Sequence, residues 1–401
     1  MTRLLKALLA AALLAAPARA QVSDDAVRIG VLEDMSTAMA DTFGQGETAA
    51  ARLAIEDFGG TVLGKPVELV SADHQSKPDV AAGIARRWFD TERVDMVTGL
   101  ANSAIALGVQ GLARERGRVT IITGSGSTDI TGKGCSPTGA HWVIDTHALA
   151  RAVAEPLVRQ GLDTWFYVVA DITLGRSLVA DVTPVVQAGG GRVLGQAVHP
   201  LLTTDMAAPM VQAAASRAKV VALMNVGGDA VNAVKQAAEF GLLRGGQQLA
   251  GLYLSVTDVR AIGLETTQGT YLAEAFYWDQ DDGARAFARR YAERMGGRMP
   301  NSYQAGVYSA VTHYLKAVRQ AGTDAAPAVM AAMRALPVED FMTRRGTLRE
   351  DGRLLRDVHL FQAKRPDESR GEWDLLRRVA TLPGEQAFRP LEGSECPHLR
   401  R

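Results

Sequence analysis

Short apolar runs alternate with amphipathic segments along the first third of the chain. The apolar runs have the length of buried β-strands, and the segments between them place apolar residues at helical spacing. The expected strands are residues 27–32, 67–71, 94–97 and 119–122. The expected helices cover 48–58, 78–91 and a segment that begins at Asn102 or Ser103. Regular alternation of this kind predicts a parallel sheet with helices on both faces.

The alternation starts again after residues 141–146, which predicts a second α/β domain. Its expected strands are residues 165–169, 193–198, 220–224, 249–254 and 270–278. The expected helices are 149–159, 175–187, 206–218, 229–240, 283–295 and 303–321. The remainder is polar without a clear period, so we expect irregular structure there. Two similar halves imply a cleft between them, with short ordered crossings as hinges.

Two loops rich in glycine and serine follow neighbouring strands of the first half. One continues from Thr98-Gly99 towards Ser103, and the other contains Ser125, Gly126 and Ser127. Parallel crossovers bring both loops to the carboxyl ends of adjacent strands, where open α/β sheets bind ligands. Their backbone N–H groups and serine hydroxyls suit an anion, most simply a carboxylate. The alternative, that these glycines and serines only form turns, stays open.

The N-terminal residues 1–20 have the features of a secretory signal peptide. Arg3 and Lys6 precede a short apolar run, and Ala18-Arg19-Ala20 is a typical cleavage site. We therefore expect a soluble protein exported to the periplasm, with a mature chain that begins near Gln21. No other apolar stretch reaches the roughly 20 residues of a membrane helix.

Composition narrows the classes of partner and chemistry. The 44 basic and 44 acidic residues balance, which argues against nucleic acid and anionic membranes as partners. Cys135 and Cys396 are the only cysteines, and in an oxidising compartment they favour one disulfide, with two unpaired thiols as the alternative. His74, His141 and His147 stand in separate loops without the spacing of metal ligands. We expect no metal and no cofactor.

Motifs in a characteristic order along nearly the whole mature sequence carry a family resemblance. They are residues 28–32 with Met35-Ser36, Gly44 with 49–57, 72–75, 99–103, 123–128, Asp171 with Gly175, 225–229, 235–237 and 303–306. In these the chain resembles the periplasmic substrate-binding proteins of ABC importers, in the leucine/isoleucine/valine-binding branch. The resemblance implies an α/β fold of two Rossmann-like lobes, joined by a three-segment hinge. The expected lobes are residues 21–144 plus 275–345, and 145–274 plus 346–401.

The resemblance also implies which residues contact the ligand. From the first lobe it assigns the carboxylate to Ser103, Ser125, Gly126 and Ser127, and the ligand side chain to Phe43. From the second lobe it implies Ile172 and Leu174, where the family usually has an aromatic residue, together with Asn225 and Tyr253. Tyr277 is expected to form either an aromatic wall of the cleft or part of the core.

Tyr253 stands where the family places an acidic residue against a ligand ammonium group. A buried cation without a counter-charge is unfavourable. The sequence therefore favours a small apolar or aromatic carboxylate over a plain α-amino acid. The expected function is a receptor that delivers this solute to an ABC permease and its ATPase, without enzymatic activity.

Two other functions compete with a transport receptor. A periplasmic protein of this family could present its solute to a signalling partner instead of an importer. An exported hydrolase with Ser125 as nucleophile is the enzymatic alternative. Gly-x-Ser-x-Gly is not satisfied around Ser125, and no Ser, His and acid appear in a plausible order at the ends of the expected strands.

Overall fold

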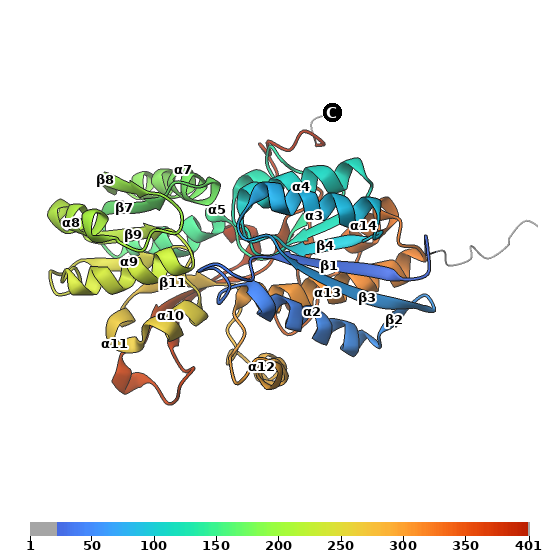
Figure 1. Cartoon of the computed structure of the whole chain (residues 1–401). Coiled ribbons are helices and arrows are strands. Elements are labelled where there is room, and N and C mark those ends of the chain that lie inside the picture. Colours follow the sequence, from blue (N-terminus) through green and yellow to red (C-terminus); the bar gives the residue numbers. More distant parts are fainter. Residues whose placement is uncertain (1–21, 400–401) are drawn as a thin grey trace, which may run out of the picture.

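Two α/β lobes lie side by side in the computed structural model, which describes residues 22–399 (Figure 1). The expected signal peptide at 1–20 lies outside the described residues. Each lobe is built on its own mainly parallel sheet. The alternating pattern of the sequence therefore predicted the fold class correctly.

The first sheet has the strand order β2-β3-β1-β4-β5-β6 and is parallel except at β2. Its strands are β1 (Val27–Glu33), β2 (Thr61–Val62), β3 (Lys65–Asp73), β4 (Met96–Gly99), β5 (Val119–Ile122) and β6 (Gly139–His141). Its helices are α2 (Gly44–Phe58), α3 (Pro78–Asp90), α4 (Ser103–Glu115), α12 (Asp282–Arg294), α13 (Ser302–Ala321) and α14 (Ala326–Ala335). Helices α3 and α4 cover one face and α2 and α13 the other, so the sheet is buried on both sides.

The second sheet has the order β15-β14-β11-β10-β9-β7-β8. Its strands are β7 (Thr164–Ala170), β8 (Arg192–His199), β9 (Val220–Met224), β10 (Gln248–Gly251), β11 (Tyr271–Glu274), β14 (Val358–Ala363) and β15 (Leu376–Leu382). Its helices are α5 (Thr146–Leu149), α6 (Glu155–Arg159), α7 (Thr173–Ala188), α8 (Ala207–Ser216), α9 (Gly228–Glu239), α10 (Val256–Ile262) and α11 (Leu264–Thr267). A π-helical turn (Ala150–Ala154) connects α5 to α6. Strands β14 and β15 are antiparallel to their neighbours, and the other pairs are parallel.

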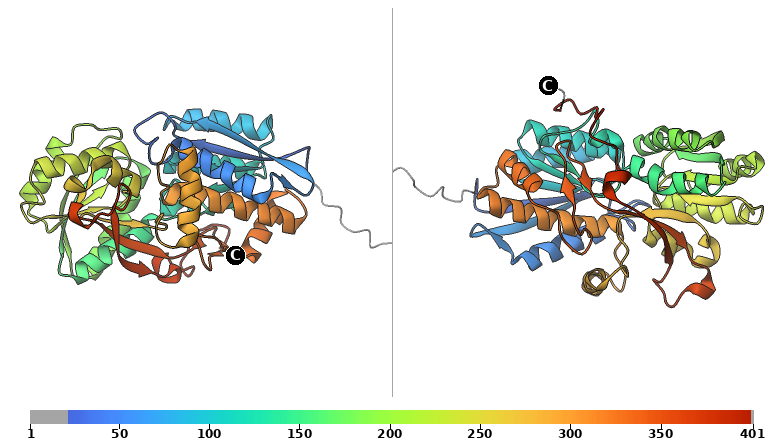
Figure 2. Two further views of the ribbon diagram at one scale, coloured as in Figure 1. Left: turned by 90° about the horizontal axis from the view of Figure 1, so that it is seen from below. Right: turned by 180° about the vertical axis from the view of Figure 1, so that it is seen from behind.

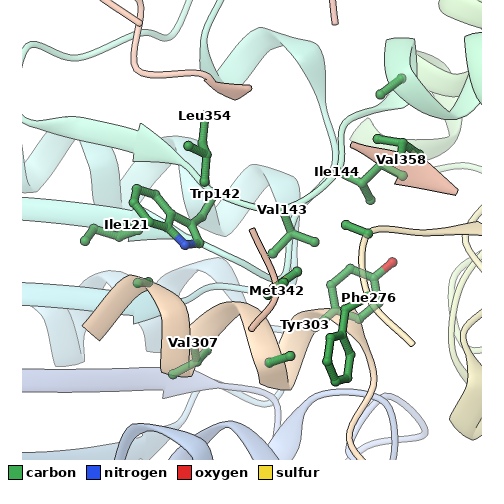
Figure 3. Packing of buried hydrophobic residues seen from close by; sticks show 14 of the residues in the cluster. Ile121, Trp142, Val143, Ile144, Phe276, Tyr303, Val307, Met342, Leu354 and Val358 are labelled. Carbon is green, nitrogen blue, oxygen red and sulfur yellow. The ribbon is translucent and has the colours of Figure 1, made fainter. Parts of the chain in front are cut away.

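The chain passes between the lobes after β6, after β11 and before β14. Val143 and Ile144 from the first crossing, Phe276 from the second and Val358 from the third belong to one buried cluster (Figure 3). A fourth passage follows β15, where the chain continues through α15 (Gly384–Ala387) back to the first lobe (Figure 2). There Cys396 forms a disulfide with Cys135, which confirms the expected bond.

The expectation of irregular structure beyond residue 321 was wrong. That region contains α14, the small hairpin β12 (Thr347–Leu348) and β13 (Leu354–Leu355), and both antiparallel strands of the second sheet. Strand β15 escaped prediction because it lies at the sheet edge, where most of its side chains are exposed and need no apolar period.

The strand expected at 270–278 is shorter in the structure, where β11 ends at Glu274. The hydroxyl of Ser302 accepts hydrogen bonds from the backbone N–H groups of Ala275 and Phe276, both at 3.0 Å. These two groups are therefore bound by α13 instead of by a neighbouring strand. A contact between residues so distant in sequence leaves no local signal.

Candidate functional site

The two glycine- and serine-rich loops meet at the carboxyl ends of β4 and β5. Thr123 and Gly124 both donate backbone hydrogen bonds to the carbonyl of Gly99, at 3.2 and 3.0 Å. The backbone N–H of Ser127 donates to the hydroxyl of Ser103 at 3.4 Å. Gly99 has a φ of +93°, which favours glycine at this sharp turn. The loops therefore form one unit, as the crossover predicted.

The polar groups of this unit differ in their availability for a ligand. Asn102 caps α4 by accepting from the N–H groups of Ala104 and Ile105, at 3.0 and 3.4 Å, so the helix start offers few free donors. The hydroxyl of Ser125 donates to the carbonyl of Leu100. Within residues 22–399, the backbone N–H groups of Ser125 and Gly126 have no hydrogen-bond acceptor. These two N–H groups are therefore left to donate to an anion.

The second lobe closes onto this unit at Gly126. The hydroxyl of Tyr253 donates to the carbonyl of Gly124 at 3.2 Å. A Cβ atom on Gly126 would lie 2.6 Å from the ring of Tyr253 and 3.0 Å from a methyl group of Leu174. The hydroxyl of Ser127 lies 2.7 Å from that of Ser177 on α7. Both lobes therefore contribute side chains to the same small region.

An aromatic layer borders this region. The ring of Tyr303, at the start of α13, has centroid distances of 4.8 Å to Phe43 and 5.4 Å to Tyr253. All three rings are buried. Phe43 thus lies in the same neighbourhood as Tyr253, and the ring of Tyr303 contacts both.

Ile172 and Asn225 follow β7 and β9 at the same edge of the second sheet where Tyr253 follows β10, whereas Tyr277 stands apart from this group. Ile172 immediately precedes α7, and buried Asn225 follows β9, where its side-chain amide lies 3.3 Å from Nε2 of His199. Tyr277 packs in the core of the second lobe, and its hydroxyl donates to the carbonyl of Trp373 at 3.0 Å. The structure therefore places Tyr277 in core packing and does not bring it to the other candidates.

Further hydrogen bonds hold the lobes together around the site. The hydroxyl of Thr42 donates to Asp258 on α10 at 2.9 Å. The backbone N–H of Gly228 donates to the carbonyl of Ala38 at 3.0 Å. The hydroxyl of Thr128 donates to Asp181 on α7 at 3.1 Å. Sequence reasoning missed these contacts because their partners are far apart along the chain.

Sequence reasoning also missed two acidic residues beneath the loops. Glu33 at the end of β1 and Glu47 in the first turn of α2 are both fully buried. Burial raises the pKa of both carboxyl groups above the ordinary range. An acidic residue after an apolar strand is a weak signal, because such residues usually face solvent.

Comparison with known proteins identifies the family. A model of the family described as periplasmic binding protein matches residues 26–371. The chain belongs to this family. No curated protein matches the sequence. None of the helices within residues 22–399 has the length and apolar character needed to cross a membrane.

Solved structures of this family are similar over almost the full chain. A periplasmic binding protein from Burkholderia mallei is 43% identical, covers 94% of this chain and 100% of its own, and has a TM-score of 0.91. A branched-chain amino acid ABC transporter ligand-binding protein from Burkholderia xenovorans is 40% identical over 92% of this chain and 99% of its own, with a TM-score of 0.83. A solute-binding protein from R. palustris in complex with 4-hydroxybenzoate shares the fold, with 20% identity, coverage of 92% and 100%, and a TM-score of 0.83.

Proposed function

We propose that this protein is a periplasmic solute receptor, which captures a small carboxylate-bearing solute between its lobes and delivers it to an ABC importer. The observation that carries the proposal is the pair of unpaired N–H groups at Ser125 and Gly126, at the point where the second lobe meets the first. Membership of a solute-receptor family supports it. Adjacent N–H groups of a turn suit a carboxylate because they supply positive partial charge without a titratable group.

Capture would begin on the first lobe and end with closure. In the proposed complex the carboxylate accepts from the N–H groups of Ser125 and Gly126 and from the hydroxyls of Ser103 and Ser127. Phe43 packs on the remainder of the solute. Tyr253, Leu174, Ile172 and Asn225 approach from the second lobe. The solute shifts the equilibrium towards the closed state only by its differential affinity for that state.

The identity of the residue at position 253 bears on the solute class. The Tyr253 side chain is neutral at physiological pH, because burial raises its pKa above the ordinary value. It therefore offers no counter-charge to an ammonium group. Relatives that bear on the class include a branched-chain amino acid receptor and a receptor bound to 4-hydroxybenzoate. We favour a small apolar or aromatic acid over an α-amino acid.

The proposed partners are the solute, a membrane permease and its ATPase, with the receptor in the periplasm.

The hydrolase alternative loses support at Ser125. Its hydroxyl donates to the carbonyl of Leu100, and the nearby His141 ring contacts the backbone carbonyl of Ser125 at 2.7 Å rather than the hydroxyl. A nucleophilic serine instead needs a base within hydrogen-bond reach of its oxygen. We propose a non-enzymatic role.

A thermal-shift screen of the mature protein tests the proposal. The panel contains aromatic acids, aliphatic acids, α-amino acids and the matched amide of each acid. A solute at 100 times its dissociation constant adds about 2.7 kcal/mol to the free energy of unfolding. We expect stabilisation by an acid and none by its amide. Stabilisation by neutral compounds alone would refute carboxylate capture.

A further inference from the structure

Glu33 and Glu47 lie together directly beneath the two loops of the proposed site. The Oε2 atoms of both side chains lie within 3 Å of the point that a Cβ on Gly99 would occupy, at 2.8 and 2.9 Å. Both residues have 0% exposure. Within residues 22–399, Oε2 of Glu33 and both carboxyl oxygens of Glu47 lack a hydrogen-bond donor. Two carboxyl groups this close can hydrogen bond to each other only when one of them carries a proton.

No strong cation in the described part of the chain balances this pair. Its only neighbour within ion-pair distance among residues 22–399 is His74, whose Nε2 lies 3.7 Å from Oε1 of Glu33. Burial lowers the pKa of His74 to about 4, so its ring is neutral at physiological pH. The other titratable groups that face the pair are Asp34, Tyr253 and Tyr291, and none of them supplies positive charge.

Glu33 is connected directly to the ligand loops. Its Oε1 accepts from the backbone N–H of Ala101 at 3.2 Å, and its Oε2 lies 3.2 Å from the Cβ position of Gly124. Ser125 follows Gly124, so Glu33 contacts the loop that carries the N–H groups proposed to bind the solute. Negative charge on the pair would oppose a carboxylate at those groups, whereas a protonated pair would not.

We propose that Glu33 and Glu47 form a shared-proton pair that couples capture of a carboxylate solute to uptake of a proton by the receptor. The inference rests on the proposed function and adds to the same site a pair of carboxyl groups whose protonation is linked to solute binding. The arriving carboxylate favours protonation of the pair, and by linkage protonation favours the carboxylate. Solute affinity therefore falls as the pH rises, although the solute itself stays ionised.

Isothermal titration calorimetry with the best acid of the screen tests the coupling between pH 6 and 9. For each pH, two buffers with different ionisation enthalpies report the protons taken up. We expect the dissociation constant of the wild-type protein to rise by up to about tenfold per pH unit for each proton taken up. Glu47→Gln and Glu33→Gln each remove an ionisable carboxyl group, so either should flatten this dependence.

The matched control is Asp95→Asn, a buried acid at the opposite end of β4. Burial raises the pKa of Asp95 to about 7, so it titrates in the same pH range but away from the loops. Its substitution should leave the proton uptake unchanged. Binding of the acid without proton uptake, or uptake that survives Glu47→Gln, would overturn the shared-proton pair while leaving the receptor function intact.

Urea unfolding of the solute-free protein tests the pair separately. The folded state holds protons that the unfolded state releases, so wild-type stability should decrease as the pH rises from 5 to 9. The decrease should be smaller for Glu47→Gln. Equal slopes in both proteins would overturn the pair even if no acid binds. Absence of binding by every acid would instead contradict the proposed function, and the coupled capture with it.

Discussion

Gly126 shows how a single residue without a side chain shapes the proposed site. Its missing Cβ leaves room for the ring of Tyr253 and the side chain of Leu174, which approach from the other lobe. Those two side chains fill the space that a methyl group would need. Because both belong to the second lobe, a larger residue should oppose closure more than folding of the first lobe.

Replacement of Gly126 by alanine should therefore weaken solute binding. The added methyl group would lie 2.6 Å from the ring of Tyr253, so closure would require that ring to move. We expect affinity to fall by about tenfold, which corresponds to about 1.4 kcal/mol, as measured by calorimetric titration. Unchanged affinity would contradict the close approach of Tyr253 to Gly126 in the closed state.

The control for this variant is Gly111→Ala, on α4 in the same lobe. Among residues 22–399, a Cβ on Gly111 meets no atom within 4 Å, and the residue lies inside a helix. Alanine there should leave solute affinity unchanged and raise the free energy of unfolding by roughly 0.5–1 kcal/mol.

Residue identities predicted part of the site and missed the rest for physical reasons. The Gly-Ser loops could be recognised because special turns and free N–H groups require those residue types. The hydroxyl of Ser125 instead donates to the carbonyl of Leu100, and this contact depends on the approach of another loop. The burial of Glu33 and Glu47 likewise depends on packing between β1, α2 and β4, which local sequence does not encode.

Elements with a strong hydrophobic pattern were predicted close to their true bounds. Elements fixed by distant contacts were not. Strands β5 and β9 match their expected ranges because both are short, fully buried apolar runs. Strand β6 has three residues and no period, so it was missed. Strand β11 ends early because Ser302 on α13 takes over two backbone N–H groups.

Substitution of Ser302 by alanine should therefore destabilise the junction between β11 and α13. It would leave the N–H groups of Ala275 and Phe276 without their shared acceptor, and buried Glu274 without its hydroxyl partner. We expect a loss of about 1–3 kcal/mol in the free energy of unfolding, measured in urea. Ser369→Ala, at a partly exposed turn, is the control and should change it by less than about 0.5 kcal/mol.

At the scale of the whole molecule, the chain links its lobes by a covalent route in addition to the hinge. The segment after β15 returns from the second sheet to the first lobe, where Cys396 bonds Cys135 across a sequence separation of 261 residues. Along this route Arg389 forms an ion pair with Asp181 on α7. The C-terminal segment thus contacts both lobes.

Replacement of Cys396 by serine should lower the stability of the folded protein. Loss of a crosslink that closes so long a loop should reduce the free energy of unfolding by about 2–5 kcal/mol, as measured by urea unfolding. Reduction of the wild-type protein should give the same change, and the double variant with Cys135→Ser should not respond to reductant. A wild-type protein insensitive to reductant would contradict a stabilising disulfide.

Closure of the lobes should also depend on the hydrogen bond between Thr42 and Asp258. Thr42→Val keeps the shape but leaves an oxygen of buried Asp258 without that donor. We expect the closed state to lose about 1–3 kcal/mol relative to the open state, which small-angle scattering would detect as a larger radius of gyration. Thr183→Val, whose hydroxyl contacts Tyr167 within the second lobe, is the control and should leave the radius unchanged.

Calorimetric titration of the best acid and its matched amide against the wild-type protein tests carboxylate capture most directly. The two compounds differ in the charged group that the N–H groups of Ser125 and Gly126 are proposed to bind. We expect measurable binding of the acid, and binding of the amide that is weaker by about tenfold or more. Equal affinity for both compounds would contradict capture of a carboxylate at these loops.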